Sequence, residues 1–471
     1  MKEQMIFGSK IDSYFDEILA DLAKLIAIPS VCEEGSETEP FGQPCREALD
    51  CILEMASRLG LSTENIGYYA GEARLGEGDT YIDVLTHVDV VPAGDGWDSD
   101  PYEMVQKGNC LYGRGTSDDK GAAIAALYAL KALKDAGVKG NYCLRAVFGC
   151  GEEIGSNDLD IYYSRRGFPK MGFTPDCSYG ICNSEKGILR IDFSASHKEG
   201  SVIRQIHAGN AVNAVPNKAS AELSCTDGQF DRLAALLSDR SDFTLEKIDG
   251  LVHIQSAGKA AHGAEPELGE NAASKLLLVL HQVFTPDELG ALFTFAAEKI
   301  GMEYQGSSLG IQMADKESGP LTFNLGVVSL KNETELLSID IRYPVTADKE
   351  QIVSCLTEAA LPWGVTVTEV NHMAPLHVPD DSLLVKTLSG AYEAVTGEEC
   401  NIYSTGGGTY ARHANNTTAA FGPAFPGQPS SNAHGPNEYI DLEHYRQHCR
   451  VCLEAMYRLF TAPKDETGTE D

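Results

Sequence analysis

The stretch that decides the fold is residues 81–91, YIDVLTHVDVV, a short β-branched and apolar run that ends at His87 and Asp89. Such a run, followed by the Gly- and Pro-rich segment 92–96, is typical of a buried strand. Residues two apart on a strand point to the same side, and Asp89 could then accept the second ring N–H of a metal-bound His87. A histidine near a strand end is by itself more often structural, so this interpretation depends on the segments that follow.

An acidic pair follows in residues 113–121, GRGTSDDKG, just before an Ala-rich helical run at 122–136. One aspartate would be enough to cap the helix and favour its dipole. Asp118 and Asp119 repel each other unless a cation lies between them or one points away. The pair therefore favours a metal site.

A second acidic pair lies in residues 149–156, GCGEEIGS, directly after the apolar run 144–148. Adjacent carboxylates in such a turn project in different directions, so one can bind a metal while its neighbour acts as a base. A solvated turn is the alternative, but a position after a buried strand favours function. Asp176, in the loop that follows residues 171–175, indicates little by itself.

Composition limits the classes of function. The 471 residues carry a formal net charge of −32, which disfavours nucleic acid as a partner because phosphate binding depends on Lys and Arg. No apolar run is long enough to cross a bilayer, and residues 1–10 lack a signal-peptide core. The 13 cysteines are scattered and odd in number, as in a reduced cytoplasmic protein.

The order of the patterns predicts an α/β fold with a largely parallel sheet, followed by an antiparallel α+β insert. Helical stripes at 11–26, 45–59 and 122–136 alternate with strands at 81–91 and 142–149, and ligands gather at the carboxyl ends of such strands. From about residue 185, period-two alternation appears at 188–194, 219–225, 252–256, 321–330 and 334–343. Helices return at 382–395 and 442–460, before a polar tail expected to be disordered.

The second half of the chain adds further polar candidates. His262 and Arg342 lie in the insert, where single residues of this kind are more often surface groups. The segment 404–412, STGGGTYAR, offers backbone N–H groups for an anion but has no lysine in P-loop spacing, which disfavours nucleotides. His434 lies in the loop 432–438, NAHGPNE.

Taken in order, these motifs resemble the cocatalytic-metal hydrolases, the family of aminoacylase, succinyl-diaminopimelate desuccinylase, carboxypeptidase G and bacterial dipeptidases. The resemblance covers nearly the whole chain. It implies a zinc-peptidase-like catalytic domain formed by residues 1–185 and 378–471, with a lid domain at 186–377. The lid is larger than in typical members and is similar to that of the dipeptidase V (PepV) branch, which implies a monomer.

The resemblance also implies a role for each motif. His87 and Asp176 would bind one metal ion, Glu153 and His434 the other, and Asp118 would bridge the two. Asp89 would orient His87, and Glu152 would be the general base. Nitrogen and oxygen ligands suit catalytic Zn²⁺, and Mn²⁺ or Co²⁺ would fit the same set.

The implied reaction is hydrolysis of the peptide bond of a dipeptide by a water shared between two metal ions. His262 would stabilise the oxyanion. Arg342, Asn213 and the loop Gly406, Gly407 and Gly408 are candidates for binding the substrate carboxylate. Domain closure over a small peptide would then select dipeptides over proteins.

Two departures from the family pattern affect the substrate subsite and metal preference, namely residues 150–151 before the Glu pair and 428–430 before His434. Two alternatives stay open. The chain could be an N-acyl amino acid deacylase or carboxypeptidase of the same family, or a non-catalytic metal-dependent binding protein. Because no ligand or base is missing, a non-catalytic protein is disfavoured. The full ligand set together with the large lid favours hydrolysis of dipeptides.

Overall fold

The computed structural model describes residues 6–464, and the chain divides into two compact units. Of the described residues, the first unit contains 6–184, 376–403 and 408–464, and the second contains 185–375 and 404–407. Residues 404–407 thus group with the second unit, whereas the sequence-based boundaries assign them to the catalytic domain. The end of the polar tail, residues 465–471, lies outside the described residues.

Within residues 6–464 the first unit is built on a nine-stranded sheet with the order β1-β2-β6-β3-β7-β22-β9-β20, and β21 pairs with β9. Its strands are β1 Ser62–Ile66, β2 Ala70–Leu75, β3 Tyr81–His87, β6 Cys143–Gly149, β7 Met171–Thr174, β9 Ile181–Glu185, β20 Leu376–His377, β21 Ile402–Thr405 and β22 Thr418–Ala420. Shorter strands outside it are β4 Val105–Lys107, β5 Cys110–Tyr112, β8 Cys177–Ser178, β23 Pro423–Ala424 and β24 Tyr439–Asp441.

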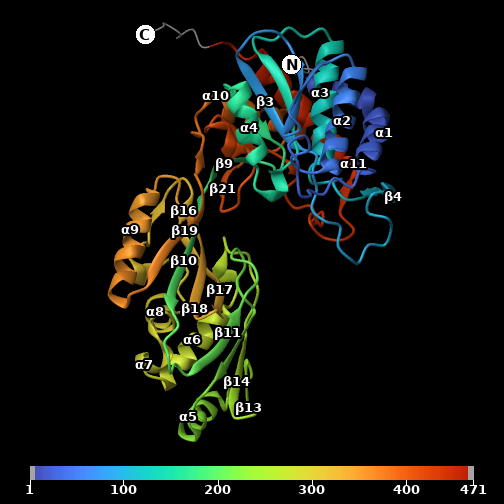
Figure 1. Ribbon diagram of the computed structural model, residues 1–471. Helices are drawn as coiled ribbons and strands as arrows, with labels where there is room; N and C mark the ends of the chain where they lie inside the picture. Colours follow the sequence, from blue (N-terminus) through green and yellow to red (C-terminus); the bar gives the residue numbers. More distant parts are fainter. Residues whose placement is uncertain (1–5, 465–471) are drawn as a thin grey trace. The chain divides into compact units, whose positions relative to one another are not determined.

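Helices cover both faces of this sheet (Figure 1). They are α1 Phe15–Ile26, which the 3-10 turn η1 Phe7–Tyr14 precedes, α2 Gln43–Arg58, α3 Lys120–Asp135, α4 Asn157–Arg166, α10 Leu383–Thr396 and α11 Leu442–Thr461. On β3, Ile82 and Val84 face the larger core beneath α1, α2, α3 and α11, while Leu85 faces α4. A strand covered on both faces is continuously apolar, which explains the run in residues 81–87.

The centre of the sheet is parallel and its edges are antiparallel. Strand β3 pairs in parallel with β6 and β7, and β22 in parallel with β7. The hairpin β1–β2 joins the edge of β6 in antiparallel fashion. In the β3–β6 register His87 lies opposite Gly149, so the polar segments that follow both strands leave the sheet at one edge.

The expected strand 81–91 ends at His87 rather than at Val91. Beyond His87 the chain makes single hydrogen bonds instead of a ladder. Val88 N–H donates to the carbonyl of Gly149, at 2.9 Å, and Val90 N–H to that of Ser30, also at 2.9 Å. The strand therefore gives way to irregular chain where the polar residues begin.

The second unit contains an eight-stranded sheet among the described residues, with the order β13-β14-β12-β11-β17-β18-β10-β19. Its neighbouring strands pair in antiparallel fashion throughout. Its strands are β10 Gly187–Ser196, β11 Ile203–Ala208, β12 Lys218–Leu223, β13 Phe243–Ile248, β14 Leu251–Ala257, β17 Thr322–Lys331, β18 Thr334–Tyr343 and β19 Thr366–Met373, with β15 Ala314–Asp315 and β16 Gly319–Pro320 apart from them.

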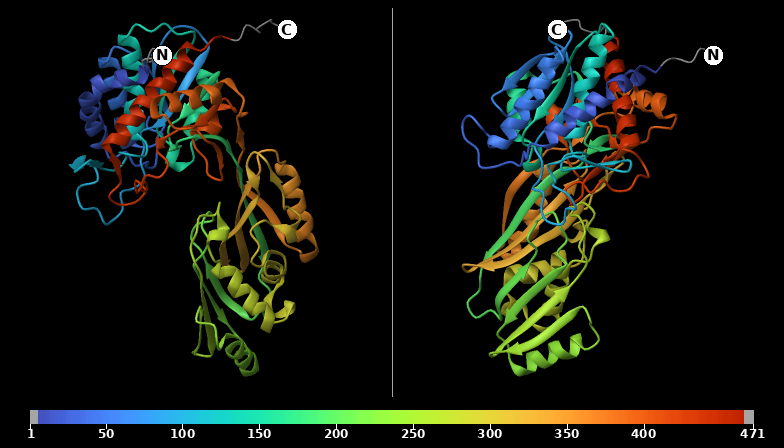
Figure 2. Two further views of the ribbon diagram at one scale, coloured as in Figure 1. Left: turned by 180° about the vertical axis from the view of Figure 1, so that it is seen from behind. Right: turned by 90° about the vertical axis from the view of Figure 1, so that its right-hand side faces the viewer.

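Helices pack against one face of this second sheet (Figure 2). They are α5 Asp227–Leu237, α6 Ala272–Val283, α7 Pro286–Leu289, α8 Ala291–Phe295 and α9 Lys349–Ala360. On β12, Ala219, Ala221 and Leu223 are buried while the alternate residues are more exposed. This alternation is typical of an antiparallel sheet with one face in water. The predicted α/β fold with an α+β insert is confirmed.

Within residues 6–464 no helix combines the length and the apolar character needed to cross a membrane.

Candidate metal centre

His87 lies at the end of β3 with both ring nitrogens engaged. Its Nδ1–H donates to the backbone carbonyl of Asp89 at 3.0 Å, and Nε2 lies 3.1 Å from Oδ1 of Asp118. The carboxylate of Asp89 lies farther from Nδ1, at 3.4 Å, because it accepts the backbone N–H groups of Glu152 and Glu153 at 3.3 and 3.1 Å. Asp89 thus orients the imidazole of His87 mainly through its backbone carbonyl. Its carboxylate instead fixes the turn that contains Glu152 and Glu153.

Asp118 lies between two imidazoles. Its Oδ1 is 3.1 Å from Nε2 of His87, and its Oδ2 is 3.1 Å from Nε2 of His434. Burial alone would raise the pKa of Asp118, but hydrogen bonds from His434 and His87 hold it below its usual value. Its neighbour Asp119 points elsewhere, and its Oδ2 accepts the backbone N–H of His87 at 3.3 Å. Only Asp118 is therefore placed to bridge two ligand groups.

His434 completes the second side of the centre. It has a left-handed backbone, with φ of 63°, which is uncommon outside glycine. Its Nε2 lies 3.1 Å from Oδ2 of Asp118 and 3.1 Å from Oε2 of Glu153. Hydrogen bonds to these two carboxylates raise the pKa of His434 to about 10.

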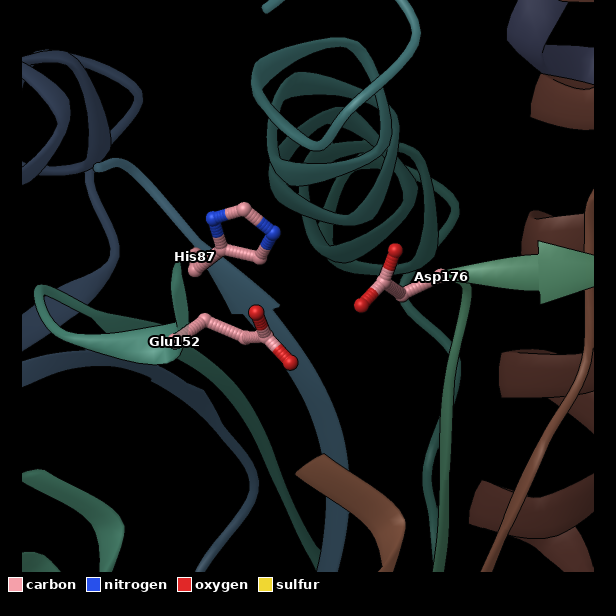
Figure 3. Close-up of side chains that lie close together, drawn as sticks. All are labelled: His87, Glu152 and Asp176. Carbon is pink, nitrogen blue, oxygen red and sulfur yellow. The ribbon is translucent and has the colours of Figure 1, made fainter. Parts of the chain in front are cut away.

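Glu152 and Asp176 meet His87 on the other side. Each of the three offers one ligand atom, and these atoms lie within 4.8 Å of one another. Figure 3 shows the three side chains pointing toward a common space. Burial raises the pKa of Glu152 to about 8, with the positive His87 opposing and Asp89 adding to the shift. Burial and the charge of Asp118 likewise raise the pKa of Asp176 well above its usual value.

The donor set fits divalent cations. His87, Asp118 and Glu153 form a second group whose ligand atoms lie within 4.8 Å of one another. Carboxylates outnumber imidazoles here, and one buried oxygen, Oδ1 of Asp119, has no hydrogen-bond partner among the described residues. Crowded buried carboxylates are stabilised by positive charge. Imidazole nitrogen and carboxylate oxygen are ligands of Zn²⁺, Mn²⁺ and Co²⁺ alike.

A cluster of two imidazoles and several carboxylates lies at the edge of a mixed sheet, with His87 buried, His434 exposed and the carboxylates partly buried. Metallohydrolases use centres of this type. The chain belongs to the peptidase family M20/M25/M40, whose model matches residues 84–458. The family recognised from the sequence is therefore confirmed, and so is the prediction of a peptide-hydrolysing enzyme.

Relatives with similar sequences match along nearly their whole length. The chain is 33% identical over 457 residues to "Putative dipeptidase YtjP" of Bacillus subtilis strain 168, covering 94% of this chain and 97% of the relative. It is 31% identical over 468 residues to a Staphylococcus saprophyticus protein also named "Putative dipeptidase", covering 96% and 99%.

Solved structures share the fold at low identity. The dipeptidase Dug1p of Saccharomyces cerevisiae matches with a TM-score of 0.59 and 16% identity, covering 98% of this chain and 100% of that chain. Aminoacylhistidine dipeptidase of Vibrio alginolyticus matches with a TM-score of 0.56 and 14% identity, covering 97% and 98%.

Most of the residues predicted to bind substrate lie in the second unit. The backbone carbonyl of Asn213 accepts the N–H of Gly263 at 2.7 Å, next to His262. The His262 side chain is exposed, and partial desolvation followed by the charge of Arg342 lowers its pKa. Arg342 in turn donates from Nη1 to the carbonyl of Gly406 at 2.7 Å. Five of the six predicted positions thus lie in the second unit, while Gly408 belongs to the first unit.

Two details of this group differ from the sequence-based picture. The planar fork of Arg342 is bound by Asp340, with Nε and Nη2 at 2.6 and 2.9 Å from its two oxygens. Gly406 presents its carbonyl to Arg342, and Gly407 N–H donates to Oγ1 of Thr405 at 3.0 Å. Since the Asp340 and Gly406 bonds use three of the five guanidinium N–H groups, at most two are left for a substrate carboxylate.

Sequence reasoning missed several buried residues that hold the ligand-bearing loops. Asp158, Tyr410, Arg114 and Glu438 are all nearly inaccessible to solvent. Each acts through contacts with chain segments distant in sequence. The only local signal was the position of Glu438, four residues after His434 in the same loop.

Proposed function

We propose that this member of the family is a metal-dependent dipeptidase that hydrolyses the peptide bond of dipeptides. The observation that carries the proposal is the position of Asp118, whose two oxygens each lie 3.1 Å from a different imidazole. His87 and Asp176 would hold one divalent ion, Glu153 and His434 the other, and Asp118 would contact both. When bound, the ions would act as Lewis acids that lower the pKa of water and polarise the scissile carbonyl.

Glu152 is the proposed general base. Its partly buried carboxyl lies beside His87 and Asp176, and its backbone N–H donates to Asp89 at 3.3 Å. In this role Glu152 removes a proton from the attacking water and returns it to the nitrogen of the departing amine. A raised pKa, about 8, suits a group that both accepts and donates a proton near neutral pH.

The group in the second unit is the proposed substrate-binding set. His262 would donate a hydrogen bond to the oxyanion of the tetrahedral intermediate. Asn213, Arg342 and the loop Gly406, Gly407 and Gly408 would bind the carboxylate of the dipeptide. Two hydrogen bonds within this unit, one between Gly263 and Asn213 and one between Arg342 and Gly406, support this proposal.

The ion identity, the compartment and the assembly complete the proposal. We propose Zn²⁺ as the native ion, with Mn²⁺ or Co²⁺ able to replace it. The 13 scattered cysteines, an odd number, support a reducing, cytoplasmic compartment. We propose a monomer without nucleic-acid or membrane partners, which light scattering of the purified protein tests directly.

The deciding experiment is a substrate panel. Metal-stripped protein is supplied with Zn²⁺, Mn²⁺ or Co²⁺ and offered dipeptides, tripeptides and N-acyl amino acids. Metal-dependent cleavage of dipeptides alone is expected. Cleavage of N-acyl amino acids would reassign the chain to the deacylases. Metal binding without any turnover would instead identify a non-catalytic binding protein.

A further inference from the structure

Glu438 is a fully buried carboxylate that serves four donors from the loop preceding α3. Its Oε1 accepts the backbone N–H groups of Ser117 and Asp118 at 2.8 and 3.1 Å. Its Oε2 accepts the N–H of Gly115 at 3.0 Å and Nη1–H of Arg114 at 2.7 Å. Each oxygen therefore has two donors, so an uncharged amide in the same place could satisfy only one of the two pairs.

Arg114 extends this contact to two further segments. Its guanidinium is buried and donates from Nη2 to the carbonyl of Gly435 at 3.1 Å, next to His434. The same nitrogen lies 3.4 Å from the carbonyls of Pro92 and Ala93, in the chain that follows β3, and the guanidinium lies over the ring of Trp97. One ion pair thus connects the loop that carries Asp118 with the loop that carries His434.

We infer that Glu438, together with Arg114, is a positioning residue that sets the geometry of the Asp118–His434 ligand pair. The inference rests on the proposed metal centre and adds a residue outside its ligand set. Glu438 fixes the backbone N–H of Asp118 directly and is four residues from His434 in its loop. Asp118 Oδ2 and His434 Nε2 lie 3.1 Å apart. Because these atoms come from two different loops, their separation depends on the contact that the Glu438 carboxylate makes between the loops.

The substitution that isolates this role is Glu438→Gln, which keeps the shape but removes the charge and one acceptor pair. Metal-free full-length protein is titrated with Co²⁺ and followed by visible absorption, and with Mn²⁺ by calorimetry. We expect the affinity for the more weakly held ion to fall by about 10- to 100-fold, as for other residues that orient metal ligands. The Co²⁺ absorption band should also shift, because the ligand geometry changes.

Glu72→Gln is the matched control. Glu72 is another fully buried glutamate of the first unit, and it accepts from Tyr162 and Arg166 at 2.5 and 2.7 Å. No hydrogen bond joins it to a proposed ligand among the described contacts. Glu72→Gln is expected to lower the melting temperature while leaving Co²⁺ affinity and the absorption band unchanged.

The outcomes separate this inference from the proposed function. A folded Glu438→Gln protein with wild-type Co²⁺ and Mn²⁺ affinity overturns the positioning role, even if its stability falls. If that variant does not fold, Glu438→Asp keeps the charge on a shorter side chain. Weakened Co²⁺ binding by Glu438→Asp then supports the inference, and wild-type binding overturns it. A wild-type protein that binds no metal ion would instead contradict the proposed function.

Discussion

The hydroxyl of Tyr410 donates to Oδ2 of Asp158, and the same oxygen accepts the backbone N–H groups of Cys150 and Gly151 at 2.8 and 2.9 Å. All four residues are buried. Gly149 allows this approach, since a Cβ at that position would lie 1.9 Å from the Tyr410 hydroxyl oxygen. The carboxylate of Asp158 therefore fixes the turn that carries Glu152.

Tyr410→Phe should lower kcat by about tenfold while KM changes little, because the turn loses one of its supports without losing a ligand. The free energy of unfolding should fall by about 1 to 3 kcal/mol, as for a hydrogen bond to a charged group. Steady-state kinetics and thermal unfolding measure both. Tyr163→Phe is the control, since the Tyr163 hydroxyl donates to Asp83 at 3.0 Å without holding the turn. Equal losses of kcat in the two variants would contradict this account.

Glu152→Gln should lower kcat by about 10² to 10⁴, the range for removal of a general acid or base. The metal content should stay unchanged, because the proposed ligands of both ions are still present. Initial rates with a dipeptide and metal analysis of the dialysed protein give the two values. Substantial retained activity would remove Glu152 from the role of base.

Glu153→Gln gives the opposite pattern. Oε2 of Glu153 lies 3.1 Å from Nε2 of His434, so the variant changes a proposed ligand rather than the base. We expect it to retain about one metal ion per chain where the wild-type protein retains two. Metal analysis at matched free-metal concentration decides the question. Full occupancy in Glu153→Gln would show that the second ion is held by other residues.

Much of the site could be predicted because its ligands follow buried strands directly. His87 and Glu152 stand at the ends of β3 and β6, whose apolar runs are visible in the sequence. The edge hairpin β1–β2 was not predicted, since its residues are largely polar and Glu72 within it is nevertheless buried. Burial of that carboxylate depends on Tyr162 and Arg166, about 90 residues farther along the chain.

The contacts of Arg342 could not be predicted either. The sequence shows an arginine suited to a substrate carboxylate, but an internal partner, Asp340, binds two nitrogens of its fork. Residues two apart on a strand point to the same side, so the sequence allows an ion pair between Asp340 and Arg342. The sequence does not require that pair. Similarly, nothing local indicates that residues 404–407 group with the second unit.

Metal binding should release protons and strengthen as the pH rises. Hydrogen bonds to Asp118 and Glu153 raise the pKa of His434 to about 10 in the metal-free protein, so this imidazole is protonated at neutral pH. A ligand histidine must lose that proton. Affinity should therefore increase with pH between about 7 and 10, by up to tenfold per pH unit for each proton released.

Calorimetry of Mn²⁺ binding in two buffers of different ionisation enthalpy counts these protons. His434→Ala should release one proton fewer than the wild-type protein. An affinity that stays constant between pH 7 and 9 would contradict the assignment of His434 as a ligand.

A change at Gly406, in the proposed substrate-binding group of the second unit, should affect substrate binding but not the chemical step. A Cβ on Gly406 would lie 2.8 Å from Cβ of Ala264, too close for both to stay in place, and the Gly406 carbonyl holds Arg342. Gly406→Ala should therefore displace Arg342 and raise KM about tenfold, the effect of an overpacking cost of about 1 to 3 kcal/mol. Because the ligands lie in the first unit, kcat should stay within about twofold and metal content should not change. Gly228→Ala is the control, with no atom within 4 Å of its added Cβ. A fall in kcat with unchanged KM would place Gly406 outside the substrate-binding set.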